Sequence, residues 1–229
     1  MRQLGKIHCE EINHDDNAPW VIFFHGFGAD NKDLFSLGQV IQTKKTVNWL
    51  FPNGPLEVPI GPGWTGRAWW NIDMMEVQRA MESGTHRDFT GETPKGLDKA
   101  FEKAMEMIKQ LRVPWSKIVL GGFSQGAMLA TELYLRAPET PAGLVIMSGT
   151  LLHQEEWKKL VPARAGEKFF QSHGENDTVL GIKQARQLET LLSQNGMKGS
   201  LMSFRGGHEI PALVLTKIGQ YINDINFDK

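Results

Sequence analysis

The segment Lys-Ile-Val-Leu-Gly-Gly-Phe-Ser-Gln-Gly, residues 117–126, gives the clearest local prediction in this chain. Its first half is apolar and β-branched, which is typical of a short buried strand, and the largely apolar residues 127–135 predict a helix. A strand entering Gly-x-Ser-x-Gly and leaving into a helix is the context of a nucleophile elbow, which would hold Ser124 in strained geometry with its hydroxyl pointing out of the sheet. Gly122 and Gly126 are expected to let neighbouring backbone pass closely. The alternative is an ordinary glycine-rich turn with an incidental serine.

Length and composition restrict the class of protein. A chain of 229 residues with 41% hydrophobic and 22% charged residues fits a single α/β domain, residues 1–229. The net charge of −1 provides no basic field for nucleic acid or an anionic membrane. Cys9 is the only cysteine, which excludes an internal disulfide and a cysteine-rich metal cluster. Neither a signal peptide nor a run of about 18 apolar residues is present, so we expect a cytoplasmic protein without a stable membrane anchor.

Strand and helix patterns alternate along the chain, which predicts a mostly parallel central sheet with helices on both faces. Near-continuous apolar runs such as residues 20–24 are typical of strands buried on both faces. Asn31 and Thr93 are expected to cap helices, and Gly196 is expected to follow the end of one. The predicted strands are residues 4–12, 20–24, 47–51, 117–121, 143–148, 168–173 and 200–204. The predicted helices are residues 31–40, 93–111, 125–137, 155–160, 179–195 and 210–225.

Residues 55–93 form the segment without a regular pattern. They are rich in proline and glycine, and contain Trp64, Trp69 and Trp70. We expect an irregular insertion here, because long loops in compact domains are usually functional or disordered and three tryptophans argue against disorder. Two interpretations remain open: the rings cover a sheet edge, or they form a wall of a substrate site.

Candidate catalytic residues follow the predicted strands, where functional groups of parallel sheets gather. A serine nucleophile needs a base that is oriented by an acid, and the elbow architecture requires the chain order serine, acid, histidine. Asp177 is the only aspartate between Ser124 and the last of these loops, and His208 is the only histidine after it. The sequence therefore predicts a triad of Ser124, Asp177 and His208.

Each candidate has an alternative interpretation. Asp177 is also suited to cap a helix that begins at Thr178, and Glu175 is a second candidate acid. We interpret His153 and His173 as structural because no acid precedes them in the required order. His25 begins a glycine-rich turn, which its ring is expected to order.

Acyl transfer also requires hydrogen-bond donors for an oxyanion. The elbow supplies the backbone N–H of Gln125, and the loop after the early strand offers that of Phe27, between two glycines. Competing motifs fail: Gly26-Phe27-Gly28 lacks the third glycine of a dinucleotide loop, residues 91–96 lack the lysine of a P-loop, and there is no His-Glu-x-x-His. We expect neither a metal nor an organic cofactor.

Several motifs together identify a resemblance. Residues 24–30 (Phe-His-Gly-Phe-Gly-Ala-Asp), 67–70 (Arg-Ala-Trp-Trp), 121–126, 174–177 (Gly-Glu-Asn-Asp) and 207–210 (Gly-His-Glu-Ile) resemble the phospholipase/carboxylesterase family. This is the acyl-protein-thioesterase-like branch of the α/β-hydrolases, and the similarity covers about residues 18–225.

The resemblance implies an α/β-hydrolase fold without a large cap domain and a serine esterase or thioesterase of broad substrate range. It assigns Ser124, Asp177 and His208 as the triad and Phe27 and Gln125 as oxyanion donors. It also implies that the segment with Trp69 and Trp70 borders the acyl site. The chain departs from the family pattern at Asn71 and Ala127, where aspartate and glycine are common, and in a longer loop at residues 74–93.

The expected function is hydrolysis of carboxylic esters, with thioesters and lysophospholipids as further substrates, through an acyl-enzyme. A serine peptidase or amidase would use the same triad, and a non-catalytic binding protein with a hydrolase fold is the alternative of a different class. The expected partner is a small ester or acylated substrate.

Overall fold

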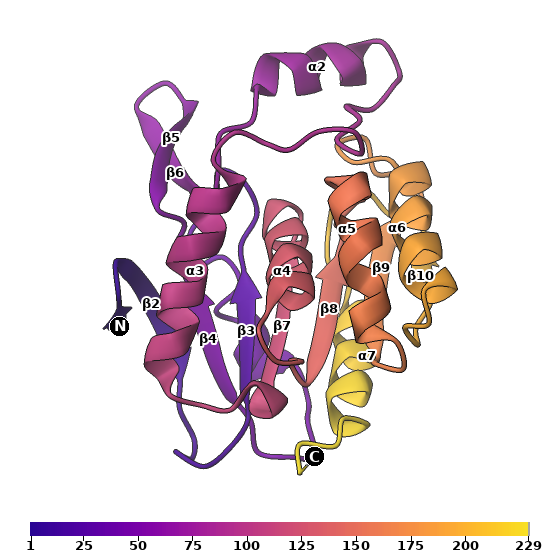
Figure 1. Ribbon diagram of the computed structural model, residues 1–229. Coiled ribbons are helices and arrows are strands. Elements are labelled where there is room, and N and C mark those ends of the chain that lie inside the picture. The colour runs from indigo at the N-terminus through magenta and orange to yellow at the C-terminus, as the bar shows by residue number, and fades with distance from the viewer. Residues whose placement is uncertain (229) are drawn as a thin grey trace.

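A mixed eight-stranded β-sheet forms the centre of the computed structural model, which describes residues 1–228 (Figure 1). The strand order is β1-β2-β4-β3-β7-β8-β9-β10. At one edge β2 is antiparallel to both β1 and β4, and all other neighbours are parallel. The strands are β1 (Arg2–Leu4), β2 (Ile7–Ile12), β3 (Trp20–Phe24), β4 (Asn48–Pro52), β7 (Ile118–Phe123), β8 (Gly143–Met147), β9 (Phe169–Gly174) and β10 (Leu201–Phe204).

Helices cover both faces of the sheet, as predicted. One hydrophobic core lies beneath α3, α4, α5 and α6, and a second lies beneath α1 and α7 on the opposite face. No helix in residues 1–228 is long and apolar enough to cross a lipid bilayer. The helices are α1 (Leu37–Val40), α2 (Met74–Glu82), α3 (Leu97–Leu111), α4 (Gln125–Arg136), α5 (Gln154–Leu160), α6 (Ile182–Gln194) and α7 (Ala212–Asn223), with 3-10 turns at Trp115–Lys117 and Val161–Arg164.

The central strands are buried along almost their whole length, since both of their faces contact helices. Every residue of β3 and β8 is buried, and so are the first five of β7. This explains why they appear in the sequence as continuous apolar runs rather than alternating ones. Because β3, β7, β8, β9 and β10 are parallel, their carboxyl ends lie along one edge of the sheet, and the loops that follow them lie there together.

The segment 55–93 is more regular than predicted. It contains an antiparallel hairpin of β5 (Leu56–Gly61) and β6 (Trp64–Ala68), followed by α2. Gly63, with a φ of 75°, helps to form the hairpin turn. Asp73 caps α2, because its carboxylate accepts the N–H groups of Met75 and Glu76. Figure 1 shows α2 above the carboxyl edge of the sheet.

The predicted starts of the first two long helical segments were wrong. Residues 31–36 form successive turns, stabilised by Asp30, whose carboxylate accepts the Lys32 N–H, so α1 is confined to Leu37–Val40 and Asn31 is not its cap. The helix predicted from Thr93 begins at Leu97, because Gly96 precedes it with a φ of 99°. Thr93 and Pro94 belong to the turn before it, in which the Leu97 N–H bonds to the Pro94 carbonyl.

The last long helix before β10 starts later than predicted but ends as expected. α6 begins at Ile182 rather than near Val179, because Asp177 accepts the N–H groups of the intervening turn. Gly196 lies just beyond its end with a φ of 91°, which confirms the predicted position after the helix.

Candidate active site

Ser124 lies on a sharp turn between β7 and α4. Its backbone has φ 55° and ψ −120°, a conformation that costs free energy in a non-glycine residue and that is found at nucleophile elbows. The neighbouring glycines are required: a Cβ at Gly126 would lie 1.9 Å from the Phe24 carbonyl oxygen, and one at Gly122 would lie 2.4 Å from the Gly126 carbonyl carbon. Because α4 begins at Gln125, the positive end of its dipole faces Ser124.

Asp177 lies in the loop after β9 and is buried, with 4% of its surface exposed. Its Oδ1 accepts the N–H groups of Val179 and Leu180, each at 2.9 Å. Its Oδ2 lies 2.7 Å from His208 Nδ1. Burial opposes ionisation, but the hydrogen bond and charge of His208, with the Leu180 N–H, hold the pKa of this carboxyl below its usual value. Asp177 is therefore an ionised acceptor for His208.

His208 lies in the loop after β10 with its side chain largely covered. Its ring contacts the Phe123 ring, with centroids 4.7 Å apart, next to Ser124 in the chain. Nδ1–H donation to Asp177 leaves the Nε2 lone pair available as a base. Among residues 1–228 no hydrogen bond joins Ser124 Oγ to His208; such bonds often form only when substrate binds. Glu175, the second candidate acid, instead accepts the Ser203 hydroxyl at 2.8 Å.

The loop with the expected oxyanion donor Phe27 lies beside Ser124. A Cβ at Gly26 would be 3.3 Å from the Ser124 Cβ. Two backbone hydrogen bonds of 2.8 Å, Gly28 N–H to Arg67 O and Arg67 N–H to Ala29 O, join this loop to β6. No hydrogen bond within the described chain uses the Phe27 N–H. The N–H of Gln125, the first residue of α4, has no acceptor within its helix.

The side chain of Gln125 has a role that the sequence analysis missed. It is buried, and its Oε1 accepts the Trp69 N–H at 3.0 Å while its Nε2 donates to the Trp70 carbonyl at 2.8 Å. Trp69 and Trp70 are themselves only 1% exposed and belong to the core. Their rings are therefore not brought to an open surface of the site, whereas the residue Trp64 is 73% exposed.

His25 orders the Phe27 loop, as expected. Its Nδ1 donates to the Gly26 carbonyl at 2.7 Å, and its Nε2 accepts the Gly54 N–H at 2.9 Å. Burial lowers the pKa of His25 to about 4, so the ring is neutral near pH 7. The Trp69 indole N–H donates to the His25 carbonyl and joins this loop to the residue that directly follows β6.

Two more histidines surround the loop of Asp177. His173 is fully buried, and its Nε2 lies 2.7 Å from the Leu180 carbonyl and 3.3 Å from Asp177 Oδ2. Burial lowers the pKa of His173, which makes it a neutral structural group, in agreement with its predicted role. His86, from the segment between α2 and α3, donates its Nε2–H to the Asp177 carbonyl at 2.8 Å. Nothing in the local sequence around His86 indicates this contact.

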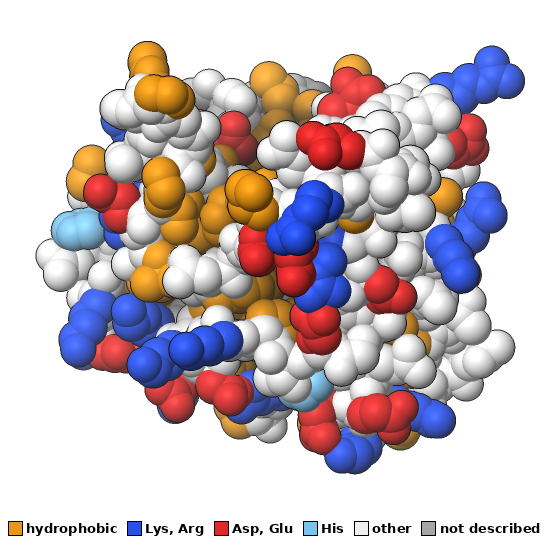
Figure 2. All heavy atoms as spheres, turned by 90° about the horizontal axis from the view of Figure 1, so that it is seen from above, with side chains coloured by type: hydrophobic (Ala, Val, Ile, Leu, Met, Phe, Trp, Pro, Cys, Tyr) orange, Lys and Arg blue, Asp and Glu red, His pale blue; other side chains and the backbone are white. Residues whose placement is uncertain are grey.

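The surface contains both an apolar region and a separate groove. In residues 55–93 the side chains of Ile60, Trp64, Met74, Met75 and Met81 are exposed. Figure 2, which looks onto the carboxyl ends of the strands, shows hydrophobic side chains gathered over the left half of this face.

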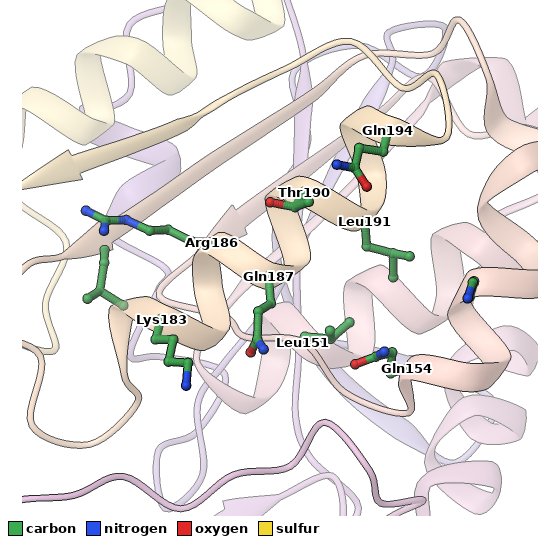
Figure 3. A pocket seen from close by; sticks show the side chains of 10 residues that line it. Leu151, Gln154, Lys183, Arg186, Gln187, Thr190, Leu191 and Gln194 are labelled. Atoms are coloured by element: carbon green, nitrogen blue, oxygen red, sulfur yellow. The ribbon is translucent and has the colours of Figure 1, made fainter.

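A groove of about 530 Å³ lies between α5 and α6 (Figure 3). Its lining includes Leu151, Gln187 and Leu191 but none of the predicted triad, so it is not the catalytic pocket.

The strand order of the sheet and the sharp turn at Ser124 define an α/β-hydrolase fold. Comparison with known proteins gives the family. Residues 8–226 match the model of the phospholipase/carboxylesterase family, so the chain belongs to that family and is an ester hydrolase. It is 29% identical over 187 residues to an acyl-protein thioesterase 1 of Candida albicans, covering 78% of each chain. An acyl-protein thioesterase 1 of Debaryomyces hansenii is 27% identical over 188 residues, again with 78% of each covered.

Solved structures confirm the fold. Esterase PE8 superimposes with a TM-score of 0.80 at 23% identity, covering 96% of this chain and 99% of that one. A carboxylesterase from Mesorhizobium loti superimposes with a TM-score of 0.71 at 17% identity, covering 96% and 95%. The predicted α/β-hydrolase fold is therefore confirmed.

Proposed function

We propose that this protein hydrolyses carboxylic esters with Ser124 as nucleophile, His208 as general base and Asp177 as the acid that orients His208. The observation that carries this proposal is the 2.7 Å contact between Asp177 Oδ2 and His208 Nδ1, at the same sheet edge as the strained Ser124. A serine hydroxyl is a weak nucleophile near pH 7 and requires such a base.

In the proposed reaction, His208 Nε2 takes the proton of Ser124 as Oγ attacks the ester carbonyl carbon. The backbone N–H groups of Phe27 and Gln125 bind the oxyanion of the tetrahedral intermediate. Protonated His208 then donates its proton to the departing alcohol or thiol, and an acyl-enzyme remains on Ser124. Water, deprotonated by His208, attacks the acyl carbon; the bond to Ser124 Oγ then breaks, the carboxylic acid leaves, and protonated His208 returns its proton to Oγ.

The aromatic segment contributes to the proposed site through its backbone. Gln125, a proposed oxyanion donor, binds the main chain of Trp69 and Trp70, so these two residues fix the border of the acyl site with their rings in the core. The exposed apolar side chains nearby, among them Trp64 and Met75, suit acyl chains better than charged substrates.

The substrate range and location are parts of the same proposal. Thioester hydrolysis is supported by the acyl-protein thioesterases among the relatives, and comparing S-butyryl and O-butyryl nitrophenyl substrates tests it. Turnover of the oxygen ester alone would exclude thioesters. A cytoplasmic location is supported by a single, buried, unpaired cysteine, and cell fractionation tests it.

Replacement of the nucleophile tests the proposed mechanism. Ser124→Ala removes Oγ, and we expect kcat for p-nitrophenyl butyrate to fall by about 10⁴- to 10⁶-fold. Ser36→Ala is the matched control, because Ser36 is exposed and its side chain does not cap α1, and it should retain the wild-type rate. A Ser124→Ala enzyme with near-wild-type turnover would exclude the mechanism.

A further inference from the structure

Residues 71–96, which we call the bridging segment, pass over the carboxyl ends of the parallel strands, from the β5–β6 hairpin to the loop of Asp177. The segment leaves β6, passes above the sheet as α2 and continues into α3 (Figure 1). Beyond α2 it reaches the loop of Asp177, where His86 Nε2 donates to the Asp177 carbonyl oxygen at 2.8 Å. His86 therefore contacts the residue that orients the proposed base, across a sequence separation of 91 residues.

The ring of His86 contacts both ends of the turn that follows Asp177. A Cβ at Gly181 would lie 3.0 Å from Cγ and from Nδ1 of His86, closer than ordinary packing, so the ring lies against this glycine. The Asp177 carboxylate is held from within this turn by the N–H groups of Val179 and Leu180. His86 holds the backbone of the same residue from outside the turn.

The bridging segment has its own internal support, which places His86 independently of the turn. Arg87 binds Glu76 at 2.8 Å and Glu92 at 2.6 Å, and these contacts join α2 to the residues before α3. The Thr90 carbonyl accepts the Gln154 N–H at 2.9 Å, which attaches the segment to the start of α5. His86 thus joins a separately anchored segment to the backbone of Asp177.

We propose that His86 is a positioning residue that fixes the backbone of Asp177 and thereby the orientation of His208. This inference rests on the proposed function of the triad. The contact between Asp177 and His208 is a single short hydrogen bond, and its alignment depends on where the main chain of Asp177 lies. Displacement of the bridging segment would break the His86 bond, so the position of this segment sets the efficiency of proton transfer.

Three substitutions of His86 test the proposal. His86→Gln places an amide N–H near the position of Nε2, whereas the shorter His86→Asn and His86→Ala do not reach the Asp177 carbonyl. Loss of a neutral hydrogen bond has a net cost of about 0.5–1.5 kcal/mol, so we expect kcat on p-nitrophenyl butyrate to fall about 2- to 12-fold in the Ala and Asn variants. KM should stay unchanged, and His86→Gln should restore most of kcat. His14→Ala, at an exposed histidine distant in sequence, is the matched control and should behave as wild type.

The results for the His86 variants and for Ser124→Ala distinguish a failure of the His86 proposal from a failure of the proposed triad. Wild-type kcat in all three His86 variants would overturn it, as would a rise in KM at constant kcat, or equal losses in His86→Gln and His86→Ala. Urea unfolding midpoints for each variant show whether a loss of kcat reflects loss of the fold, in which case the positioning role is also rejected. Failure of the triad itself would appear in Ser124→Ala instead, whatever the His86 variants do.

Discussion

The two amide atoms of Gln125 have opposite hydrogen-bonding roles, which makes Gln125→Glu an informative perturbation. Oε1 accepts the Trp69 N–H and Nε2 donates to the Trp70 carbonyl, in a position that is 1% exposed. The substitution keeps the shape of the side chain but turns the donor into an oxygen that faces a carbonyl oxygen. A buried carboxylate in that environment binds a proton, because the neutral acid restores the donor.

The size of the effect follows from the pKa that the new carboxyl group would have. Buried glutamates reach pKa values of about 8–9, against about 4.3 in unfolded chains, and each unit of difference equals about 1.4 kcal/mol. Because the folded pKa is raised, the penalty is absent below the unfolded pKa and grows as pH rises towards the folded value. A folded pKa of only about 7 would cost about 4 kcal/mol at pH 8, a large part of the usual 5–15 kcal/mol of stability.

Urea unfolding followed by tryptophan fluorescence measures this effect at pH 5.5 and pH 8. We expect the free energy of unfolding of Gln125→Glu to lie about 2 kcal/mol below wild type at pH 5.5 and about 4 kcal/mol below it at pH 8. Gln39→Glu, on an exposed surface, is the control and should follow wild type at both values. Equal deficits of Gln125→Glu at the two pH values would refute the assigned hydrogen bonds.

Two further predictions concern the loop of Phe27. Gly66→Ala should lower the equilibrium constant for folding at least about tenfold, and kcat by a similar factor. The reason is that the new Cβ would lie 1.9 Å from the Gly28 carbonyl oxygen and would displace the Phe27 loop from β6. Gly61→Ala, in the same hairpin but with open space around its Cβ, should leave both unchanged, and similar effects of the two substitutions would contradict the packing. The pKa of His25, about 4 in the folded chain against 6.5 ordinarily, means that its contribution to stability is complete above pH 6.5 and is lost as pH falls to 4. This loss of stability amounts to about 3 kcal/mol at pH 4. His25→Gln keeps an acceptor for the Gly54 N–H and should remove that part of the pH dependence of the free energy of unfolding, measured with urea. An unchanged pH dependence would show that His25 titrates normally.

The sheet and the loops that carry the candidate site could be predicted because their signals are local. Buried parallel strands are continuous apolar runs, and a strained elbow needs glycines at fixed positions, which Gly122 and Gly126 supply. The required chain order of serine, acid and histidine left few candidates for the acid and the base. In the structure Asp177, rather than Glu175, contacts His208.

The contacts around the site could not be predicted because they join residues that are distant in the chain. Gln125 meets Trp69 and Trp70 from more than fifty residues away, and no periodicity encodes that a glutamine will bind their backbone. The density of proline and glycine in residues 55–93 concealed both the hairpin and α2, although Asp73 was a usable capping signal for the helix. The tryptophans indicated an ordered segment, but not which rings face the core.

Covalent trapping tests the central claim, nucleophilic catalysis by Ser124, most directly. The enzyme is mixed with p-nitrophenyl butyrate, quenched in acid before the steady state and digested with trypsin for mass spectrometry. The tryptic peptide 118–136 contains Ser124 as its only serine, so the acylated position is unambiguous once Thr131 and Tyr134, both buried, are distinguished by fragmentation. We predict a butyryl group on Ser124 in the wild type and none on this peptide in Ser124→Ala. Butyryl on another residue, or a normal burst of nitrophenol from Ser124→Ala, would contradict the account.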